Sequence, residues 1–308
     1  MRRKDLLDLQ SLDADEITYL LDTAQSFKEI VTRPVKKVPT LRGKSVATLF
    51  FEPSTRTRTS FEAAAKIMSA DTYSLTGTTS SAVKGESLKD TMLTLDAMGI
   101  DAFVIRHSHS GAAHLAAQYV PHKPVINAGD GTHEHPTQGL LDLLTIRQVK
   151  GRIEGLTVAI VGDILHSRVA RSNIWGLAAM GAKIHLIAPP TLLPADVDQL
   201  PVTVFTNLEA GVRGVDVVNI LRIQLERQDS AFFPSVREYA RLFGVSKLKL
   251  RDAAPDVTVL HPGPMNRGVE IASALADDKE IAVITDQVTN GVAVRMAVLF
   301  WLMGAPAP

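Results

Sequence analysis

The segment "SVATLFFEPSTRTRTSFEAAAKIM", residues 45–68, sets the fold class of this chain. Its first part, 45–51, is short, apolar and rich in β-branched and aromatic residues, which predicts a buried strand. A polar stretch follows, and then apolar residues recur at the spacing of one helix face. They are Phe61, Ala64, Ala65 and Met68. The order strand, polar turn, helix is that of an α/β protein.

The same alternation continues along the chain. Strands are expected at 101–107, 123–129, 156–163, 182–189, 215–221, 256–262 and 281–286. Helices are expected at 110–120, 135–150, 168–181 and 291–303. Strands that alternate with helices predict parallel sheets.

The length of 308 residues favours two domains. The segment "KGRIEG" (150–155) is a charged break bracketed by glycines after a long helix, and we place the boundary there. The last helix is apolar on most faces and must be buried. We therefore expect two domains, each with a parallel β-sheet flanked by helices, and a C-terminal helix that packs back on the first domain. The expected limits are 1–149 plus 288–308 for the first domain and 150–287 for the second.

The composition argues against several classes of protein. Lys plus Arg equals Asp plus Glu, 33 each. The chain therefore lacks the excess of basic residues that would indicate a nucleic-acid partner. The absence of cysteine excludes disulfides, thiolate metal sites and a thiol nucleophile. The start lacks a secretory apolar region, and the run "VAVRMAVLFWLM" is interrupted by Arg295 and too short to span a bilayer. A cytoplasmic protein without a membrane partner is expected.

The polar stretch Ser54–Ser60 carries five hydroxyls and two arginines. A helix N-terminus offers unpaired N–H groups and a partial positive charge, so a phosphate would fit there. The alternative is a cluster of caps on a solvated helix end, in which Thr59 and Glu62 fit a capping box. Arg58 is expected to pair with an acidic side chain. The stretch has no glycine, so it is not a nucleotide P-loop.

Six further polar patches follow in order. The first three are "GTTSSAVKGES" with Ser80 and Lys84, "VIRHS" with Arg106, and "HPTQ" with His135 and Gln138. The last three are "GDILHSRVARS" with Arg168, "ILRIQLER" with Arg222 and Gln224, and "HPGPMNRGVEI" with the Gly263–Pro264 turn. With the polar stretch, these patches resemble the signature motifs of the aspartate/ornithine carbamoyltransferase family. The resemblance covers nearly the whole chain, and the ordered set is far more specific than any single patch.

Within the family, the chain resembles the aspartate-using members. Ornithine-using members typically carry a Cys-bearing "HCLP" turn and an "SMG" loop, whereas this chain has "HPGP" and no cysteine. Cations at Arg168, Arg222 and Lys84 suit a substrate with two carboxylates. The resemblance implies transfer of a carbamoyl group from carbamoyl phosphate to the L-aspartate amine, the committed step of pyrimidine biosynthesis, without a cofactor or a metal. An ornithine-type enzyme is the alternative.

The resemblance also implies residue roles. The phosphate would be held by Ser54, Thr55, Arg56 and Thr57. The carbonyl oxygen would be stabilised by Arg106, His135 and Thr57. The carbamoyl NH₂ would be bound by Gln138 and the carbonyls near Gly263 and Pro264, with a cis peptide bond between these two plausible. Aspartate would be bound by Arg168, Arg222, Gln224 and Lys84.

The family pattern further implies a homotrimer. Ser80 and Lys84 would reach in from the neighbouring subunit, so that each active site is shared. Regulatory chains or a dihydroorotase are possible further partners. We also hypothesise that Glu52 pairs with Arg168 and Arg227 when the domains close on the substrates.

Three rival functions come from other classes. "HSH" (107–109) and "HEH" (133–135) look like metal ligands of a zinc amidohydrolase, although His166, His185 and His261 offer no convincing order. Pro136 after "HEH" fits the start of a helix better than a metal-binding motif. His135 taken alone would more often be the cap of that helix than a ligand. "VAIVGD" opens a Rossmann-like unit but lacks G-x-G-x-x-G. A non-catalytic sensor on the same fold is the third rival.

Overall fold

The computed structural model describes residues 3–76, 86–223 and 235–304. The chain divides into two compact units, 1–141 with 289–308 and 142–288. This division falls within a helix, α5 (Pro136–Lys150), whereas the sequence placed the boundary just after it. The limits proposed from the sequence stay a prediction. In the described residues, no helix combines the length and apolarity that a membrane crossing needs.

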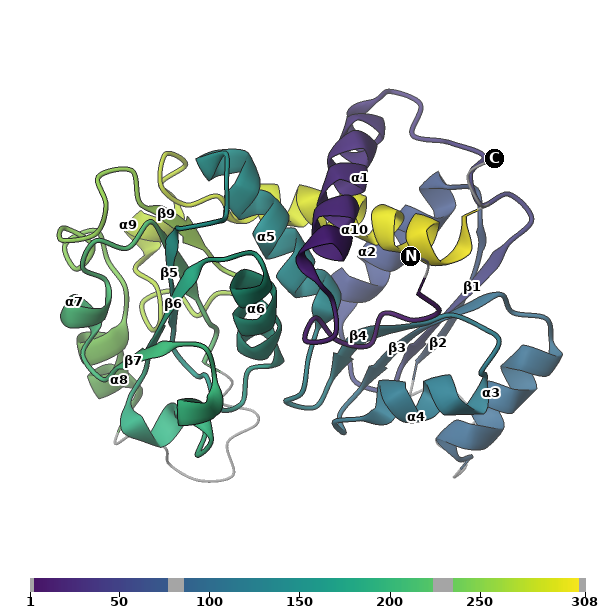
Figure 1. Ribbon diagram of the computed structural model, residues 1–308, viewed down its shortest axis with the longest axis horizontal. Helices are drawn as coiled ribbons and strands as arrows, with labels where there is room; N and C mark the ends of the chain where they lie inside the picture. Colours follow the sequence, from purple (N-terminus) through teal and green to yellow (C-terminus); the bar gives the residue numbers. More distant parts are fainter. Residues whose placement is uncertain (1–2, 77–85, 224–234, 305–308) are drawn as a thin grey trace. The chain divides into compact units, whose positions relative to one another are not determined.

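The first unit is built on a four-stranded parallel sheet (Figure 1). Its strands, in spatial order, are β2 (Asp71–Thr76), β1 (Ser45–Phe50), β3 (Ala102–His107) and β4 (Val125–Asp130). The helices that belong to it entirely are α1 (Ala14–Thr32), α2 (Thr55–Ile67), α3 (Leu88–Ala97) and α4 (Ala112–Tyr119). The predicted class of this unit is confirmed, because every strand pair in its sheet is parallel.

The core of the first unit forms where α3 and α4 cover one face of the sheet (Figure 1). Met92 and Leu95 of α3 pack with Phe103 and Ile105 of β3, and all four side chains are buried. β1 and β3 are buried nearly throughout, as expected for strands covered on both faces.

The second unit contains a five-stranded parallel sheet. Its strands, in spatial order, are β7 (Thr203–Phe205), β6 (Lys183–Ile187), β5 (Thr157–Val161), β8 (Val217–Ile220) and β9 (Thr258–Leu260). Its helices are α6 (Arg168–Ala179), α7 (Leu208–Gly211), α8 (Val236–Phe243) and α9 (Ser273–Ala276), with 3₁₀ turns at Pro190–Leu192 and Val197–Gln199. The parallel pairing again confirms the predicted class.

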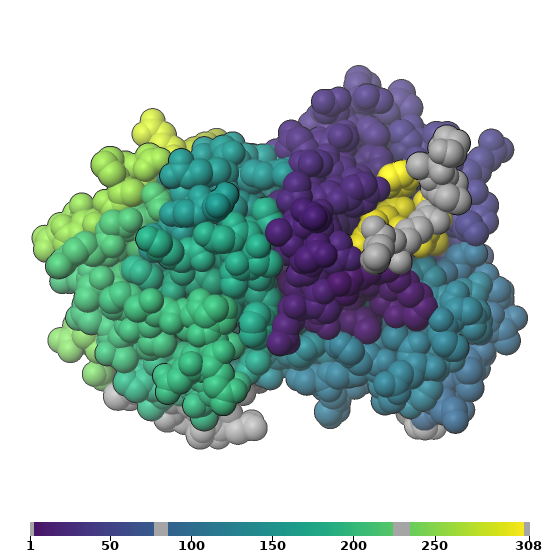
Figure 2. All heavy atoms as spheres, viewed as in Figure 1, coloured from purple at the N-terminus to yellow at the C-terminus, as the bar shows by residue number. Residues whose placement is uncertain are grey.

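The chain ends with α10 (Ile284–Met303). The prediction that this helix is buried on the first unit is confirmed: Phe300 meets Phe27 of α1 edge to face at 5.8 Å, and Trp301 is buried. On the face seen in Figure 2, only a small part of the yellow helix is visible beside the purple N-terminal segment.

The predicted strand at 281–286 is wrong. Residues from Ile284 onward form the first turns of α10, and Ala282 makes only an isolated bridge with Val259. A short apolar run reads equally well as a strand or as a buried helix start. Asp286 in the first turn favours the helix, because an acidic side chain there complements the helix dipole.

Each sheet has a topological switch point, where successive strands stop being added on one side of the first strand and start being added on its other side. In the first sheet this point lies between β1 and β3, and in the second between β5 and β8. Loops that leave the carboxyl ends of two such strands diverge, and ligands of open parallel sheets bind in the crevice between them. The fold therefore predicts one binding position at each of these two points.

Candidate active site

The N-terminus of α2 lies directly after β1, at the crevice of the first unit. Ser54 is its N-cap residue, but its side chain makes no capping bond. The first backbone bond of the helix runs from the Arg58 N–H to the Ser54 carbonyl at 3.2 Å. The preceding helical N–H groups therefore face out of the helix end, where Thr55 and Arg56 are exposed and Thr57 is buried. This geometry suits an anion.

A cavity of about 250 Å³ opens at this helix end. It is lined by Phe50, Phe51, Pro53, Ser54, Thr55, Arg58 and Thr76. Its volume accommodates a small ligand such as a phosphate ester. The walls combine apolar residues from the end of β1 with hydroxyls and a cation from α2, so the cavity is suited to a small polar anion.

Arg58 and Glu62 decide between the two interpretations of the polar stretch. The Nε of Arg58 lies 3.7 Å from the Glu62 carboxylate one turn later, which confirms that Arg58 pairs with an acid. The alternative, a Thr59–Glu62 capping box, is wrong, because α2 starts at Thr55 and Thr59 is already inside it. Glu62 instead accepts a hydrogen bond from the Ser74 hydroxyl. The helix end is thus left without a side-chain cap.

Arg106 lies at the end of β3, on the other side of the same crevice. Its guanidinium donates to the Glu52 carboxylate at 3.0 Å and to the Ala128 carbonyl at 3.2 Å. The side chain is only 12% exposed. Two anchors, Glu52 in the loop after β1 and Ala128 within β4, hold it in one orientation, which prepares it to stabilise charge without reorganising. In this structure, then, Glu52 bonds within the first unit; its hypothesised pairing with Arg168 and Arg227 stays a prediction.

His135 and Gln138 come from the start of α5. Pro136 is the first helical residue, as the sequence predicted, and proline is favoured there because its missing N–H would be unsatisfied anyway. The Gln138 N–H donates to the His135 carbonyl at 2.9 Å. His135 is buried and Gln138 half-buried. The turn therefore fixes both residues close together, after the end of β4.

One charged residue of this region, Arg295 of α10, belongs to none of the polar patches in the sequence. Its side chain is buried, its Nη1 donates to the Ser60 hydroxyl at 2.8 Å, and its guanidinium lies 5.1 Å from the Phe61 ring. Burial and the nearby Arg106 lower the pKa of Arg295 to about 10. The group therefore remains charged at neutral pH. It places a buried positive charge beneath α2, where a bound anion would be stabilised.

We expect Arg295→Met to stabilise the ligand-free protein and to weaken its response to phosphate. A pKa lowered from 12.5 to about 10 corresponds to about 3 kcal/mol against the charged form. Removing the charge regains this energy but loses the Ser60 bond and the Phe61 contact, which leaves a gain of about 1–2 kcal/mol. Unfolding in denaturant with and without phosphate measures both effects. A variant less stable than wild type, with an unchanged phosphate effect, would contradict this account.

The second unit presents two predicted cations at its own crevice. Arg168 is the first residue of α6, after β5, and is 3% exposed. The Ser167 side chain caps that helix by accepting from the Ala170 N–H at 3.1 Å. Arg222 follows the end of β8 and is half-buried. The two strands that flank the crevice thus each deliver one guanidinium, as a ligand with two carboxylates requires.

The Gly263–Pro264 bond is cis, as the sequence analysis anticipated. The turn is held by His261, whose Nδ1 accepts from the Gly263 N–H at 2.8 Å and whose Nε2 lies 3.2 Å from the buried Glu270 carboxylate. Because Nδ1 accepts, Nε2 carries the proton that bonds Glu270. The imidazole therefore links the turn to the interior of the second unit. Ser80, Lys84, Gln224 and Arg227 lie outside the described residues.

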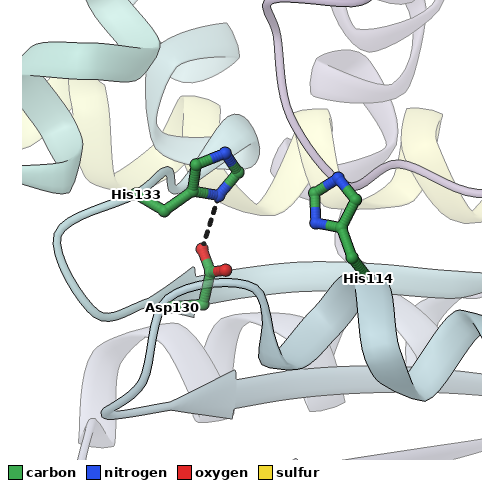
Figure 3. A group of neighbouring side chains, drawn as sticks. All are labelled: His114, Asp130 and His133. Carbon is green, nitrogen blue, oxygen red and sulfur yellow. Dashed lines mark hydrogen bonds and ion pairs between the residues drawn. The ribbon is translucent and has the colours of Figure 1, made fainter.

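The two histidine pairs considered as zinc ligands are not brought together. The backbone N–H of His109 donates to the His107 Nδ1 at 3.0 Å, and the two rings lie 5.1 Å apart, centroid to centroid. Among the described residues, the side chains that lie close enough to share a metal ion are instead His114, Asp130 and His133 (Figure 3). The rival interpretation of "HSH" and "HEH" as the ligand pairs of a zinc amidohydrolase is therefore not supported.

Comparisons with known proteins match nearly the whole chain. Residues 4–148 match the family described as "Aspartate/ornithine carbamoyltransferase, carbamoyl-P binding domain", and residues 154–302 match "Aspartate/ornithine carbamoyltransferase, Asp/Orn binding domain". The chain is 61% identical to a Heliobacterium modesticaldum protein named aspartate carbamoyltransferase catalytic subunit, over 98% of this chain and 96% of that one. A Moorella thermoacetica protein of the same name is 59% identical, over 99% and 98%.

A solved structure shows the same fold. Aspartate transcarbamoylase from Trypanosoma cruzi, in complex with N-(phosphonacetyl)-L-aspartic acid, aligns with a TM-score of 0.88 and 30% identity. The alignment covers 99% of this chain and 97% of that one.

Proposed function

Because this chain belongs to the aspartate/ornithine carbamoyltransferase family, we propose that it transfers the carbamoyl group of carbamoyl phosphate to the amine of L-aspartate. The products are N-carbamoyl-L-aspartate and phosphate. The observation that carries the proposal is the coincidence of the motif residues with the crevice of each sheet: α2 and Arg106 in one unit, Arg168 and Arg222 in the other.

The leaving phosphate is assigned to the N-terminus of α2. The uncapped N–H groups, the hydroxyls of Ser54, Thr55 and Thr57, and the guanidinium of Arg56 are donors for its oxygens. The exposed position of Arg56 allows it to reach a ligand at the helix end. Stabilising the charge that builds on phosphate favours breaking of the C–O bond.

The carbonyl oxygen gains negative charge when the aspartate amine attacks the carbamoyl carbon. We assign its stabilisation to Arg106, His135 and Thr57. Donors that are already oriented cost no reorganisation during the reaction, and the two anchors on Arg106 supply that orientation. None of these groups forms a covalent bond to the substrate, so catalysis depends on positioning and charge.

The remaining groups position the other parts of the substrates. Gln138 and the carbonyls of Gly263 and Pro264 would accept from the carbamoyl NH₂, which only donates. Arg168 and Arg222, with Gln224 and Lys84, would bind the two aspartate carboxylates. The two relatives above, both named aspartate carbamoyltransferase catalytic subunit, support aspartate over ornithine as the acceptor.

We further propose a homotrimer in which Ser80 and Lys84 serve the active site of a neighbouring subunit. A role in pyrimidine biosynthesis and a cytoplasmic location go with this proposal. All of these points rest on the family resemblance. Association with regulatory chains or a dihydroorotase would appear as a larger mass.

One assay tests the proposed function. The purified protein is incubated with carbamoyl phosphate and either L-aspartate or L-ornithine, and the ureido product and phosphate are measured. We expect equal amounts of both products with aspartate and none with ornithine. Carbamoylation of ornithine, or no turnover with either amino acid, would refute the proposal. Native mass spectrometry on the same sample tests the trimer.

We predict that Glu52→Gln impairs both catalysis and domain closure. The neutral amide holds Arg106 less firmly, because the bond at 3.0 Å is no longer charge-assisted. Small-angle X-ray scattering with and without a phosphonate–dicarboxylate bisubstrate analogue measures closure. Glu62→Gln is the matched control, since Glu62 pairs with Arg58 at 3.7 Å in the same region. Closure of the Glu52 variant equal to that of the control would refute the hypothesis.

A further inference from the structure

Three side chains from separate parts of the first unit converge outside the proposed active-site groups (Figure 3). His114 comes from the first turn of α4, Asp130 from the end of β4, and His133 from the segment before α5. One ligand atom from each lies within 4.8 Å of the others. In the view, the Asp130 carboxylate lies below the His133 imidazole and is bonded to it, and the His114 imidazole lies to one side.

The three side chains differ in exposure in a way that suits a bound ion. Asp130 is 1% exposed, whereas the side chains of His133 and His114 are 29% and 40% exposed. An ion could therefore enter from solvent between the two imidazoles and meet a buried carboxylate.

Groups around the cluster orient two of its ligands. The Nε2 of His114 lies 3.2 Å from the Asp8 carboxylate, so the nitrogen left for a ligand is Nδ1. The Oδ2 of Asp130 accepts from the Gly111 N–H at 2.7 Å, and its Oδ1 accepts from the Asn127 side chain at 2.7 Å. A carboxylate on the outer nitrogen of a histidine is the usual support of a metal ligand, because it fixes the tautomer and raises basicity.

The alternative is two separate ion pairs, His114 with Asp8 and His133 with Asp130. The two rings lie 5.4 Å apart, centroid to centroid, and one nitrogen of each lies within 4.8 Å of the other and of a carboxylate oxygen of Asp130. A single ion placed among these atoms would contact both imidazoles. In the pair at His133, Nδ1 lies 3.1 Å from the Asp130 Oδ1, and a metal ion would take the place of the proton shared between these two atoms.

We propose that His114, Asp130 and His133 bind a divalent transition-metal ion such as Zn²⁺. Two imidazole nitrogens and one carboxylate oxygen are a common zinc ligand set, and water would complete the tetrahedron. The ion would join α4 and the segment that leads to His135, with Asp8 supporting it from the N-terminal segment. Its role is structural, since none of the three ligands belongs to the groups assigned to the substrates.

Binding of Co²⁺ tests the site directly. Protein prepared without a histidine tag is stripped with a chelator and titrated with Co²⁺, whose visible bands report imidazole ligation and geometry. We expect saturation at one Co²⁺ per chain and displacement by Zn²⁺. Asp8→Asn is expected to weaken binding by about 10–100-fold, as removal of a supporting carboxylate does. Absence of visible bands in the wild-type titration would overturn the proposal.

Substitution of the ligands separates this site from adventitious binding. His114→Ala and His133→Ala should each abolish the bands. His122→Ala is the matched control, because His122 forms a similar exposed pair with Asp96 at 3.1 Å and lies outside the cluster. Circular dichroism of each variant checks folding. Retention of wild-type binding by His114→Ala, or its loss in His122→Ala, would show adventitious binding only. The readout is metal binding, so it is independent of carbamoyl transfer.

Discussion

Arg106→Ala is expected to lower kcat by at least about 10²–10³-fold, the usual effect of losing one donor to a developing oxyanion. The native guanidinium is oriented by Glu52 and by the Ala128 carbonyl, so it meets the growing charge without reorganising. Alanine removes the donor and also leaves the Glu52 carboxylate without this partner. Steady-state rates with saturating carbamoyl phosphate and aspartate measure the effect.

Two further variants make the Arg106 experiment specific. Arg106→Lys keeps the charge but cannot reproduce a planar fork that contacts several oxygens, so most of the loss should persist. Lys44→Ala removes a cation just before β1, at the amino ends of the strands and away from Arg106, where Lys44 lies 3.5 Å from Asp101. This variant should retain full activity. A near-normal kcat for Arg106→Ala would remove this residue from the proposed mechanism.

Asp142→Ala is expected to destabilise the second unit by about 3–5 kcal/mol. Asp142 is fully buried, and its carboxylate accepts hydrogen bonds from the side-chain amides of Asn173, Asn219 and Gln287 at 2.8, 3.3 and 2.7 Å. Alanine would leave these buried donors without this acceptor, at about 1–3 kcal/mol each. Denaturant unfolding followed by the tryptophan signal measures the loss.

A matched pair of variants tests the cause. Asp142→Asn keeps the volume and one acceptor oxygen, so it should lose much less stability than alanine. Asp256→Ala removes another acid of the second unit, which bonds Lys150 at 2.8 Å but is 75% exposed, and should change stability by less than about 1 kcal/mol. Equal losses in the alanine and asparagine variants of Asp142 would show that its hydrogen bonds contribute little.

Strong local patterns made much of the fold predictable from the sequence. β1 and α2 were found because an apolar run and a helical repeat stand side by side in one segment. β2 was missed because it is a largely exposed strand at the sheet edge, and "DTYSLT" carries no apolar run. α1 was missed although Asp13 and Glu16 form a capping box that marks its start.

The candidate site was predictable only where a motif lies within one loop. Arg106 lies at the end of β3 and His135 lies between β4 and α5, so their positions at the carboxyl ends of the strands could be inferred. Arg295 was noticed only as an interruption of an apolar run. Its contact with Ser60 depends on the packing of α10 against α2, which no local pattern encodes. A single arginine in a helix that is otherwise apolar was nevertheless a usable signal, because charged side chains are rarely buried unless they are paired.

The metal-binding cluster shows the same limit. His133 was noted as part of "HEH", but its neighbours Asp130 and His114 were not, because α4 and the end of β4 meet only in the folded sheet. The domain limits depend on similar information. α5 and α10 each run through the division between the two units, and a sequence break after α5 could not reveal that.

The contribution of α10 to the first unit bears on how the protein is made. Ser60 and Phe61 of α2 are synthesised well before their partner Arg295, which follows Ser60 by 235 residues. Until α10 has been synthesised, the apolar surface that it covers in the first unit stays exposed. A chain cut before α10 would therefore leave α2 without the buried charge of Arg295 and without its contact with Phe61.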